Sequence, residues 1–259
     1  MKTIGLIGGM SAASTALYYE RLNAGVQARL GGLHSADILL RSVDFAPVAA
    51  LQAAGDWAAA GALLNREALR LAHAGADFLL LATNTMHKVA ERMMAGVPVP
   101  LIHIADATAA AVIAAGHRRP ALMATAYTME QDFYTGRLRA AGLDPLIPDE
   151  ADRAETHRVI YEELCRTVIR AESRAAYEGI AARLAAAGAD SLILGCTEVG
   201  LLLGPDNAPL PVFDTTLIHC DAALDRALAG IARRDAAAAG EPGDAGRGAP
   251  TTGTAGAAA

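Results

Sequence analysis

The chain has 259 residues, of which 53% are hydrophobic and 19% are charged, and its formal net charge is −6. This length and composition can supply a full core, and no apolar stretch reaches the roughly 18 to 20 residues of a membrane-spanning helix. Charges of both signs are mixed along the chain, without a basic face for nucleic acid or a polybasic anchor for lipid. We therefore expect a small-molecule partner, no nucleic acid and no membrane.

The number and spacing of the cysteines and histidines argue against disulfides and metal sites. Cys165, Cys196 and Cys220 are odd in number and lack CxxC spacing, so we expect free thiols and neither a disulfide framework nor structural zinc. The histidines show no HExxH motif, and we expect no metal site. The N-terminal segment is unlike a signal peptide, which predicts a cytoplasmic location.

Six short runs rich in β-branched residues and leucine predict strands, and helix-like segments follow them. The runs cover residues 3–7, 37–43, 77–82, 99–104, 120–124 and 191–194. Their near-continuous apolar character is typical of strands buried on both faces of a parallel sheet by crossover helices. The sequence therefore predicts the α/β fold class.

A weak internal duplication divides the chain. One opening strand ends in GGMS at residues 8–11, and a second ends in ATAYTM at residues 124–129. Further along each half, FLLLA leads into TNTMH at residues 83–87, and SLILG leads into CTE at residues 196–198. Gly-Ala-Asp precedes both of these later strands, at residues 75–77 and 188–190.

This duplication predicts two pseudo-symmetric parallel-sheet α/β domains with the active site in the cleft between them. The first domain is expected to cover residues 1–115 and to be completed by a helix over residues 214–235. The second is expected to cover residues 116–213. Residues 236–259 are rich in Ala, Gly, Pro and Thr, which predicts a disordered tail.

Cys196 stands where a buried strand meets a helical pattern. Amides at a helix start are expected to stabilise its thiolate and lower its pKa, which makes the position reactive. The alternative explanation is a small buried residue that only packs. Thr197 and Glu198 add a hydroxyl and a carboxylate that can orient a substrate or relay a proton.

The matching strand end in the first half carries Thr83, Asn84 and Thr85. Their hydroxyl and amide groups suit a carboxylate ligand, although an ordinary helix N-cap explains Asn84 or Thr85 about as well. His87, close behind them, is expected to be a buried, hydrogen-bonded residue rather than a general acid.

A glycine pair precedes Met10 and Ser11 and is expected to let the backbone approach a ligand, with Ser11 as an anion contact or an N-cap. The segment has neither GxGxxG nor GK[ST] spacing, which argues against nucleotide binding.

Together these segments resemble a known family. GLIGGMSAAST, LLATNTMHKV, YTMEQDFY, LILGCTEVGLLL and VFDTTLIH occur in the order seen in aspartate/glutamate racemases, over roughly residues 3–232. The resemblance implies two α/β domains that close over the substrate, and one cysteine from each as base and acid on opposite faces. It implies no pyridoxal phosphate or other cofactor. The second cysteine of the pair corresponds to Cys196.

Two positions depart from the family pattern. Thr83 replaces the first cysteine, and a threonine hydroxyl is too weak an acid to form much alkoxide and too weak a base to take an α-proton. Ala124 and Ala126 stand where similar proteins often carry Gly and a basic residue. Arg166 and Arg174 are then candidates to bind a side-chain carboxylate.

The sequence therefore favours a cofactor-independent racemase or epimerase of aspartate or glutamate. Cys196 is expected to be the thiolate base, and Thr83, or a water that it holds, the proton donor on the opposite face. The expected substrate contacts are Met10, Ser11, Asn84, Thr85, Thr125, Thr197, Glu198 and Arg166.

The alternatives left open are a single-cysteine decarboxylase or isomerase of a dicarboxylic acid, and an inactive small-molecule binding protein. Cys165 and Cys220 are expected to be packing positions. A homodimer is compatible with the sequence, which does not fix the oligomeric state.

Overall fold

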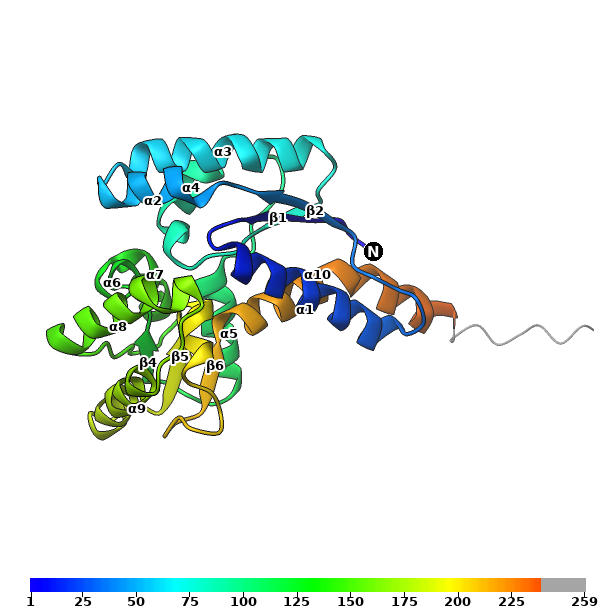
Figure 1. Cartoon of the computed structure of the whole chain (residues 1–259). Helices are drawn as coiled ribbons and strands as arrows, with labels where there is room; N and C mark the ends of the chain where they lie inside the picture. Colours follow the sequence, from blue (N-terminus) through cyan, green and yellow to red (C-terminus); the bar gives the residue numbers. More distant parts are fainter. Residues whose placement is uncertain (239–259) are drawn as a thin grey trace, which may run out of the picture.

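The computed structural model describes residues 1–238, which form an α/β fold with two three-stranded parallel sheets (Figure 1). The first sheet has the order β2-β1-β3, formed by Ile38–Ser42, Ile4–Gly8 and Phe78–Leu81. The second has the order β4-β5-β6, formed by Pro120–Met123, Ser191–Leu194 and Val212–Asp214. The predicted fold class is confirmed.

The two sheets repeat one pattern. β1 pairs with β3 in the first sheet, and β4 pairs with β5 in the second, in parallel in both cases. The Asp of each Gly-Ala-Asp segment accepts backbone N–H groups at the start of the opening strand: Asp77 accepts from Thr3 at 2.7 Å, and Asp190 accepts from Arg119 at 2.9 Å. The duplication seen in the sequence is therefore a structural repeat.

The strand predicted over residues 99–104 was wrong. Leu101 makes only an isolated parallel bridge with Leu79 beside β3. Pro98 and Pro100 have no N–H to donate, so a longer ladder cannot form there, and α5 begins at Ile104. In the second half the equivalent position beside β5 is held by β6, which the sequence reading missed because it has only three residues.

Helices connect the strands and cover both faces of each sheet (Figure 1). Their bounds are α1 Ala12–Leu30, α2 Phe45–Ala53, α3 Trp57–His73, α4 Ala90–Met93, α5 Ile104–Ala114, α6 Ala126–Glu130, α7 Asp132–Ala140, α8 Glu150–Glu162, α9 Ala171–Ala186 and α10 Thr215–Ala238. The described part of the chain also has three 3₁₀ helices, η1 Thr85–Val89, η2 Leu164–Arg166 and η3 Thr197–Leu201. Local signals set several ends: Asp56 caps α3, and Gly75 follows it with a φ of 104°.

Among the described residues, four apolar clusters form the core. Residues of α1 and α10 pack on one face of the first sheet, and α2 and α3 pack on the other. The second sheet is covered by α8 and α9 on one face and by α5 and α7 on the other. Because α10 follows β6 and packs on α1 and α5, it ties the second sheet to the first half. The domain boundaries at residues 115 and 213 stay predictions.

The end of the chain differs in part from expectation. Residues 236–238 of the expected tail belong to α10, and residues 239–259 lie outside the described part. Within residues 1–238, no helix combines the length and apolar character needed to cross a bilayer.

Candidate functional site

Two small adjoining chambers lie where the carboxyl ends of β3 and β5 meet. The Tyr18 chamber, of about 30 Å³, is lined by Met10, Ser14, Tyr18, Ala82, Thr83, Asn84, Thr85, Gly195, Cys196, Thr197, Glu198 and Thr216. The Gln52 chamber, of about 40 Å³, is lined by Met10, Ser11, Phe45, Gln52, Thr83, Thr85, Thr125, Ile160, Tyr161, Cys165, Cys196 and Glu198. Each has room for a few water molecules.

Thr83 and Cys196 border both chambers. Thr83 lies between β3 and η1, and Cys196 lies between β5 and η3, so the structural repeat brings them to one cavity. The other expected substrate contacts, except Arg166, line at least one chamber: Met10, Ser11, Asn84, Thr85, Thr125, Thr197 and Glu198. The roles of these residues stay predictions.

The buried Glu198 carboxylate links the two halves. Its Oε1 accepts the hydroxyls of Ser11 at 2.9 Å and Ser14 at 3.1 Å, both from the first half. Its Oε2 accepts the Cys196 thiol at 3.0 Å and the Thr197 hydroxyl at 2.5 Å. A carboxylate with four donors is well satisfied, and one of those donors is the candidate catalytic thiol.

The expected lowering of the Cys196 pKa was wrong. Burial raises the pKa of this thiol well above its ordinary value, and the charge of Glu198 raises it further. The Glu198 backbone N–H acts in the expected direction, but its contribution is the smallest. The resting side chain is therefore a thiol that donates to Glu198, and forming the thiolate requires a proton acceptor.

His87 holds the strand end that carries Thr83. Its Nδ1–H donates to the Thr83 carbonyl at 2.8 Å, and its Nε2 accepts the Ile104 N–H at 3.3 Å. Burial lowers the pKa of His87 well below its ordinary value, so the ring is neutral. The expectation of a buried, hydrogen-bonded histidine is confirmed.

The glycine turn before Met10 packs against protein. A Cβ on Gly9, whose φ is 93°, would lie 2.1 Å from the Val43 carbonyl oxygen. One on Gly8 would lie 2.4 Å from Thr15 Cγ2. The glycines thus serve close internal packing, and ligand space begins at Met10 and Ser11.

Ser11 acts as a helix N-cap, whereas Asn84 does not. The Ser11 side chain caps α1 by accepting the Ser14 N–H at 3.2 Å, besides its bond to Glu198. Asn84 makes no cap bond and instead donates to Thr215 Oγ1 at 3.1 Å. Asn84 is therefore held towards the cavity by a partner at the start of α10.

Three buried polar atoms lack a hydrogen-bond partner among the described residues, and all three belong to chamber-lining residues. They are Asn84 Oδ1 and Thr216 Oγ1 in the Tyr18 chamber, and Gln52 Oε1 in the Gln52 chamber. Buried polar atoms are normally paired, so these atoms mark the places where a ligand is expected to bind. The sequence reading missed Gln52 and Thr216; a lone glutamine in the apolar α2 was the available signal for Gln52.

The candidate arginines lie on neighbouring elements, Arg166 in η2 and Arg174 in α9. Arg166 is exposed and lines neither chamber, so its role as a substrate contact stays a prediction. Arg174 donates to the carbonyls of Leu202 at 2.7 Å and Leu201 at 3.1 Å, and therefore holds the chain at the end of η3. It lines neither chamber, and its candidacy for substrate binding stays a prediction.

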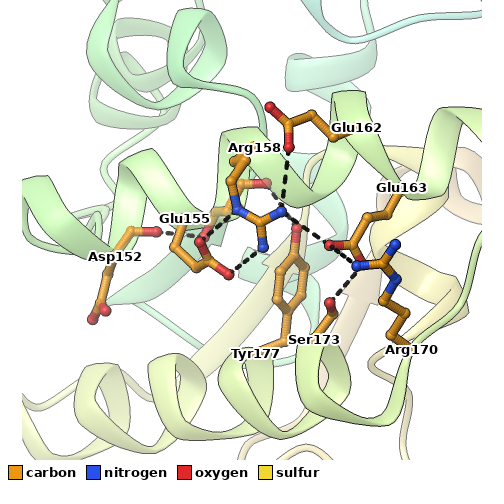
Figure 2. A network of polar contacts seen from close by, with 9 residues as sticks. Asp152, Glu155, Arg158, Glu162, Glu163, Arg170, Ser173 and Tyr177 are labelled. Atoms are coloured by element: carbon orange, nitrogen blue, oxygen red, sulfur yellow. Dashed lines mark hydrogen bonds and ion pairs between the residues drawn. The ribbon is translucent and has the colours of Figure 1, made fainter.

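Cys165 was also misread as a packing position. It is exposed and lines the Gln52 chamber from η2. Figure 2 shows the network that fixes η2: Glu163, directly before it, accepts from Ser173 at 2.6 Å and from Arg158 at 3.0 Å. Cys220 is 2% exposed in the core between α1 and α10, as expected.

Comparisons with known proteins agree with this geometry. The family described as Asp/Glu/Hydantoin racemase matches residues 7–223. A Yersinia pestis structure, provisionally assigned as an Asp/Glu racemase, is 51% identical, with 88% of this chain and 100% of that chain covered and a TM-score of 0.84. An aspartate racemase homologue from Pyrococcus horikoshii is 30% identical, with 88% and 99% covered and a TM-score of 0.75. Aspartate racemase from Picrophilus torridus, at 23% identity with 87% and 94% covered and a TM-score of 0.68, shares the fold.

Proposed function

Because the chain belongs to the Asp/Glu/hydantoin racemase family, we propose that it is a cofactor-independent racemase or epimerase of aspartate or glutamate. The observation that carries the proposal is that Thr83 and Cys196, from equivalent strand ends of the two halves, border the same two chambers. A substrate Cα at the junction of the chambers lies between an acid/base group on each face.

Cys196 is the base in this proposal. Its thiol donates to Glu198 Oε2 at 3.0 Å, so the carboxylate is placed to receive the proton when the substrate ammonium enters. The positive ammonium favours the thiolate, which offsets the effect of burial on the Cys196 pKa. The thiolate then removes the α-proton of the substrate.

Hydroxyl and amide groups on the Tyr18 chamber receive the α-carboxylate and the ammonium. The Thr216 hydroxyl, which has no partner among the described residues, can donate to a carboxylate as it gains enolate character, while the unpartnered Asn84 Oδ1 accepts from the ammonium. These contacts stabilise the carbanion that Cys196 generates.

Thr83 limits proton transfer on the face of the substrate opposite Cys196. A hydroxyl can deliver a proton, directly or through a water that it holds, but it is a poor base. Racemisation is therefore expected to run with unequal rate constants for the two enantiomers. The equilibrium constant stays one, so kcat/KM for inversion is equal in the two directions, and a lower kcat in one direction is matched by a proportionally lower KM.

The same substitution favours a second candidate function. A lone thiol protonates an enolate from one side, which is what decarboxylation or isomerisation of a dicarboxylic acid requires. Release of carbon dioxide from a substituted malonate without α-hydrogen exchange in aspartate or glutamate would favour this function.

Hydrogen exchange tests the proposal. Wild-type protein and Cys196→Ala are incubated in deuterium oxide with each enantiomer of aspartate and glutamate, and α-deuterium is followed by NMR. We expect Cys196→Ala to keep a wild-type circular dichroism spectrum and to lose at least about a hundredfold in exchange rate, the scale for a general base. Retained exchange would remove Cys196 from the mechanism.

A further inference from the structure

Gln52 has an unusual place beside the proposed catalytic pair. It lies on α2, is 5% exposed, and lines the Gln52 chamber together with Thr83 and Cys196. Its Nε2 donates to the sulfur of Met86 at 2.9 Å, whereas its Oε1 has no partner among the described residues. A buried carboxamide with one weak partner and one open acceptor is incompletely satisfied until a ligand binds.

The two chambers differ in the part of a substrate that they fit. The Tyr18 chamber is lined by several hydroxyls and by Asn84, which suit the α-carboxylate and the ammonium. The Gln52 chamber adds the apolar groups of Phe45 and Ile160, further hydroxyls and one carboxamide, and this lining suits a short side chain with a polar tip. With Cα at the junction, the side chain therefore extends towards Gln52.

The charge of the chamber walls limits how that tip is recognised. Among the described residues that line the two chambers, none is Lys or Arg. A cationic partner discriminates strongly between a carboxylate and a carboxamide. A glutamine does not, because its amide can rotate to present either N–H donors or the carbonyl oxygen.

We infer that Gln52 is the specificity-determining residue for the substrate side chain, and that the site accepts amino acids ending in a carboxamide, asparagine or glutamine, as well as the acids. This rests on the proposed racemase function. In the orientation observed, Oε1 accepts an N–H of a substrate carboxamide; after rotation, Nε2 donates to a substrate carboxylate.

The test compares kcat/KM for α-deuterium uptake with aspartate, glutamate, asparagine and glutamine. The variants are Gln52→Glu and, as a matched control, Gln27→Glu on the exposed face of α1. Wild type is expected to take the amides within about a thousandfold of the acids, well short of the 10⁴ to 10⁵ by which a dedicated polar site rejects a mismatched analogue. Gln52→Glu is expected to lower kcat/KM on the acids at least about tenfold more than on the amides, because a second carboxylate repels the acids and still accepts from the amides. Gln27→Glu should leave the ratio unchanged.

Some results would overturn only the role of Gln52, and one would overturn the proposed racemase function as well. A wild-type preference for the acids above about a thousandfold overturns the inference without any variant, so a poorly folding Gln52→Glu protein does not block the test. An acid-to-amide ratio that changes less than about threefold in folded Gln52→Glu also overturns it, because a merely structural role would lower all four rates together. Exchange with none of the four amino acids overturns the proposed function and this inference with it, whereas exchange with the acids alone overturns only the inference.

Discussion

Acid should destabilise the fold through His219. This residue is fully buried; its Nδ1 accepts the Tyr18 hydroxyl at 2.8 Å, and its Nε2–H donates to the Ile102 carbonyl at 2.9 Å. Burial lowers the pKa of His219 from its ordinary 6.5 to about 4. Because the pKa is depressed in the folded state, the stabilisation is complete above about 6.5 and is lost as the pH falls towards about 4.

The size of the effect follows from that difference. A gap of about 2.5 pKa units at about 1.4 kcal/mol per unit gives on the order of 3 kcal/mol between neutral pH and about pH 4. His103, whose pKa burial also lowers to about 4, adds a loss in the same direction. The slope contributed by His219 alone is about 1.4 kcal/mol per pH unit.

Urea unfolding followed by circular dichroism, at several values between about pH 7 and pH 4.5, measures this slope. His219→Gln should lower the free energy of unfolding at neutral pH, because it disturbs two buried hydrogen bonds, but its slope should be shallower than that of wild type by about 1.4 kcal/mol per pH unit. His34→Gln, at an exposed position, serves as the control and should keep the wild-type slope. An equal slope in His219→Gln and wild type would refute the reasoning.

Other substitutions separate the roles of the thiols and their neighbour. Glu198→Gln should lower the pH at which the Cys196 thiolate forms, because the neutral amide removes the carboxylate charge that raises the Cys196 pKa. The ultraviolet absorbance of the thiolate measures this, and an unchanged titration midpoint would argue against the coupling of Glu198 to Cys196. Cys165→Ser should keep α-deuterium exchange within a few-fold of wild type, because the residue comes from η2 and not from either of the two strand ends that carry the proposed acid/base groups. A large loss in a folded protein would give Cys165 a catalytic role. Cys220→Ser should keep the rate and lower stability by about 1 to 3 kcal/mol, because it puts a hydroxyl into an apolar core; unchanged thermal stability would contradict the packing role.

The sequence predicted the parts of the fold that depend on local pattern. Buried strands such as β1, β3 and β5 are continuous apolar runs, so their positions were correct to within a residue or so. The repeat of strand ends then predicted that Thr83 and Cys196 meet, because parallel strands present their carboxyl ends at one edge.

What the sequence missed depends on tertiary contacts. The pKa of Cys196 is set by burial and by Glu198, which outweigh the short η3 helix that the local pattern suggested. Gln52 has no motif of its own and becomes conspicuous only when its oxygen proves to be buried without a partner. The backbone contacts of Arg174 were missed because the carbonyls that it binds belong to a distant segment.

The central claim is that Cys196 is the strong acid/base on one face of the substrate and Thr83 the weak one on the other. Its most direct test follows deuterium uptake and inversion separately, starting from each enantiomer of aspartate and glutamate in deuterium oxide, with wild type and Thr83→Cys. Wild type should wash deuterium into one enantiomer faster than it inverts it, because a carbanion reprotonated by Cys196 returns to its starting hand. The other enantiomer should take up deuterium only as it inverts, until Thr83→Cys supplies a second thiol. Equal uptake from both enantiomers in wild type, with no gain in Thr83→Cys, would contradict the claim and show that another residue is the second base.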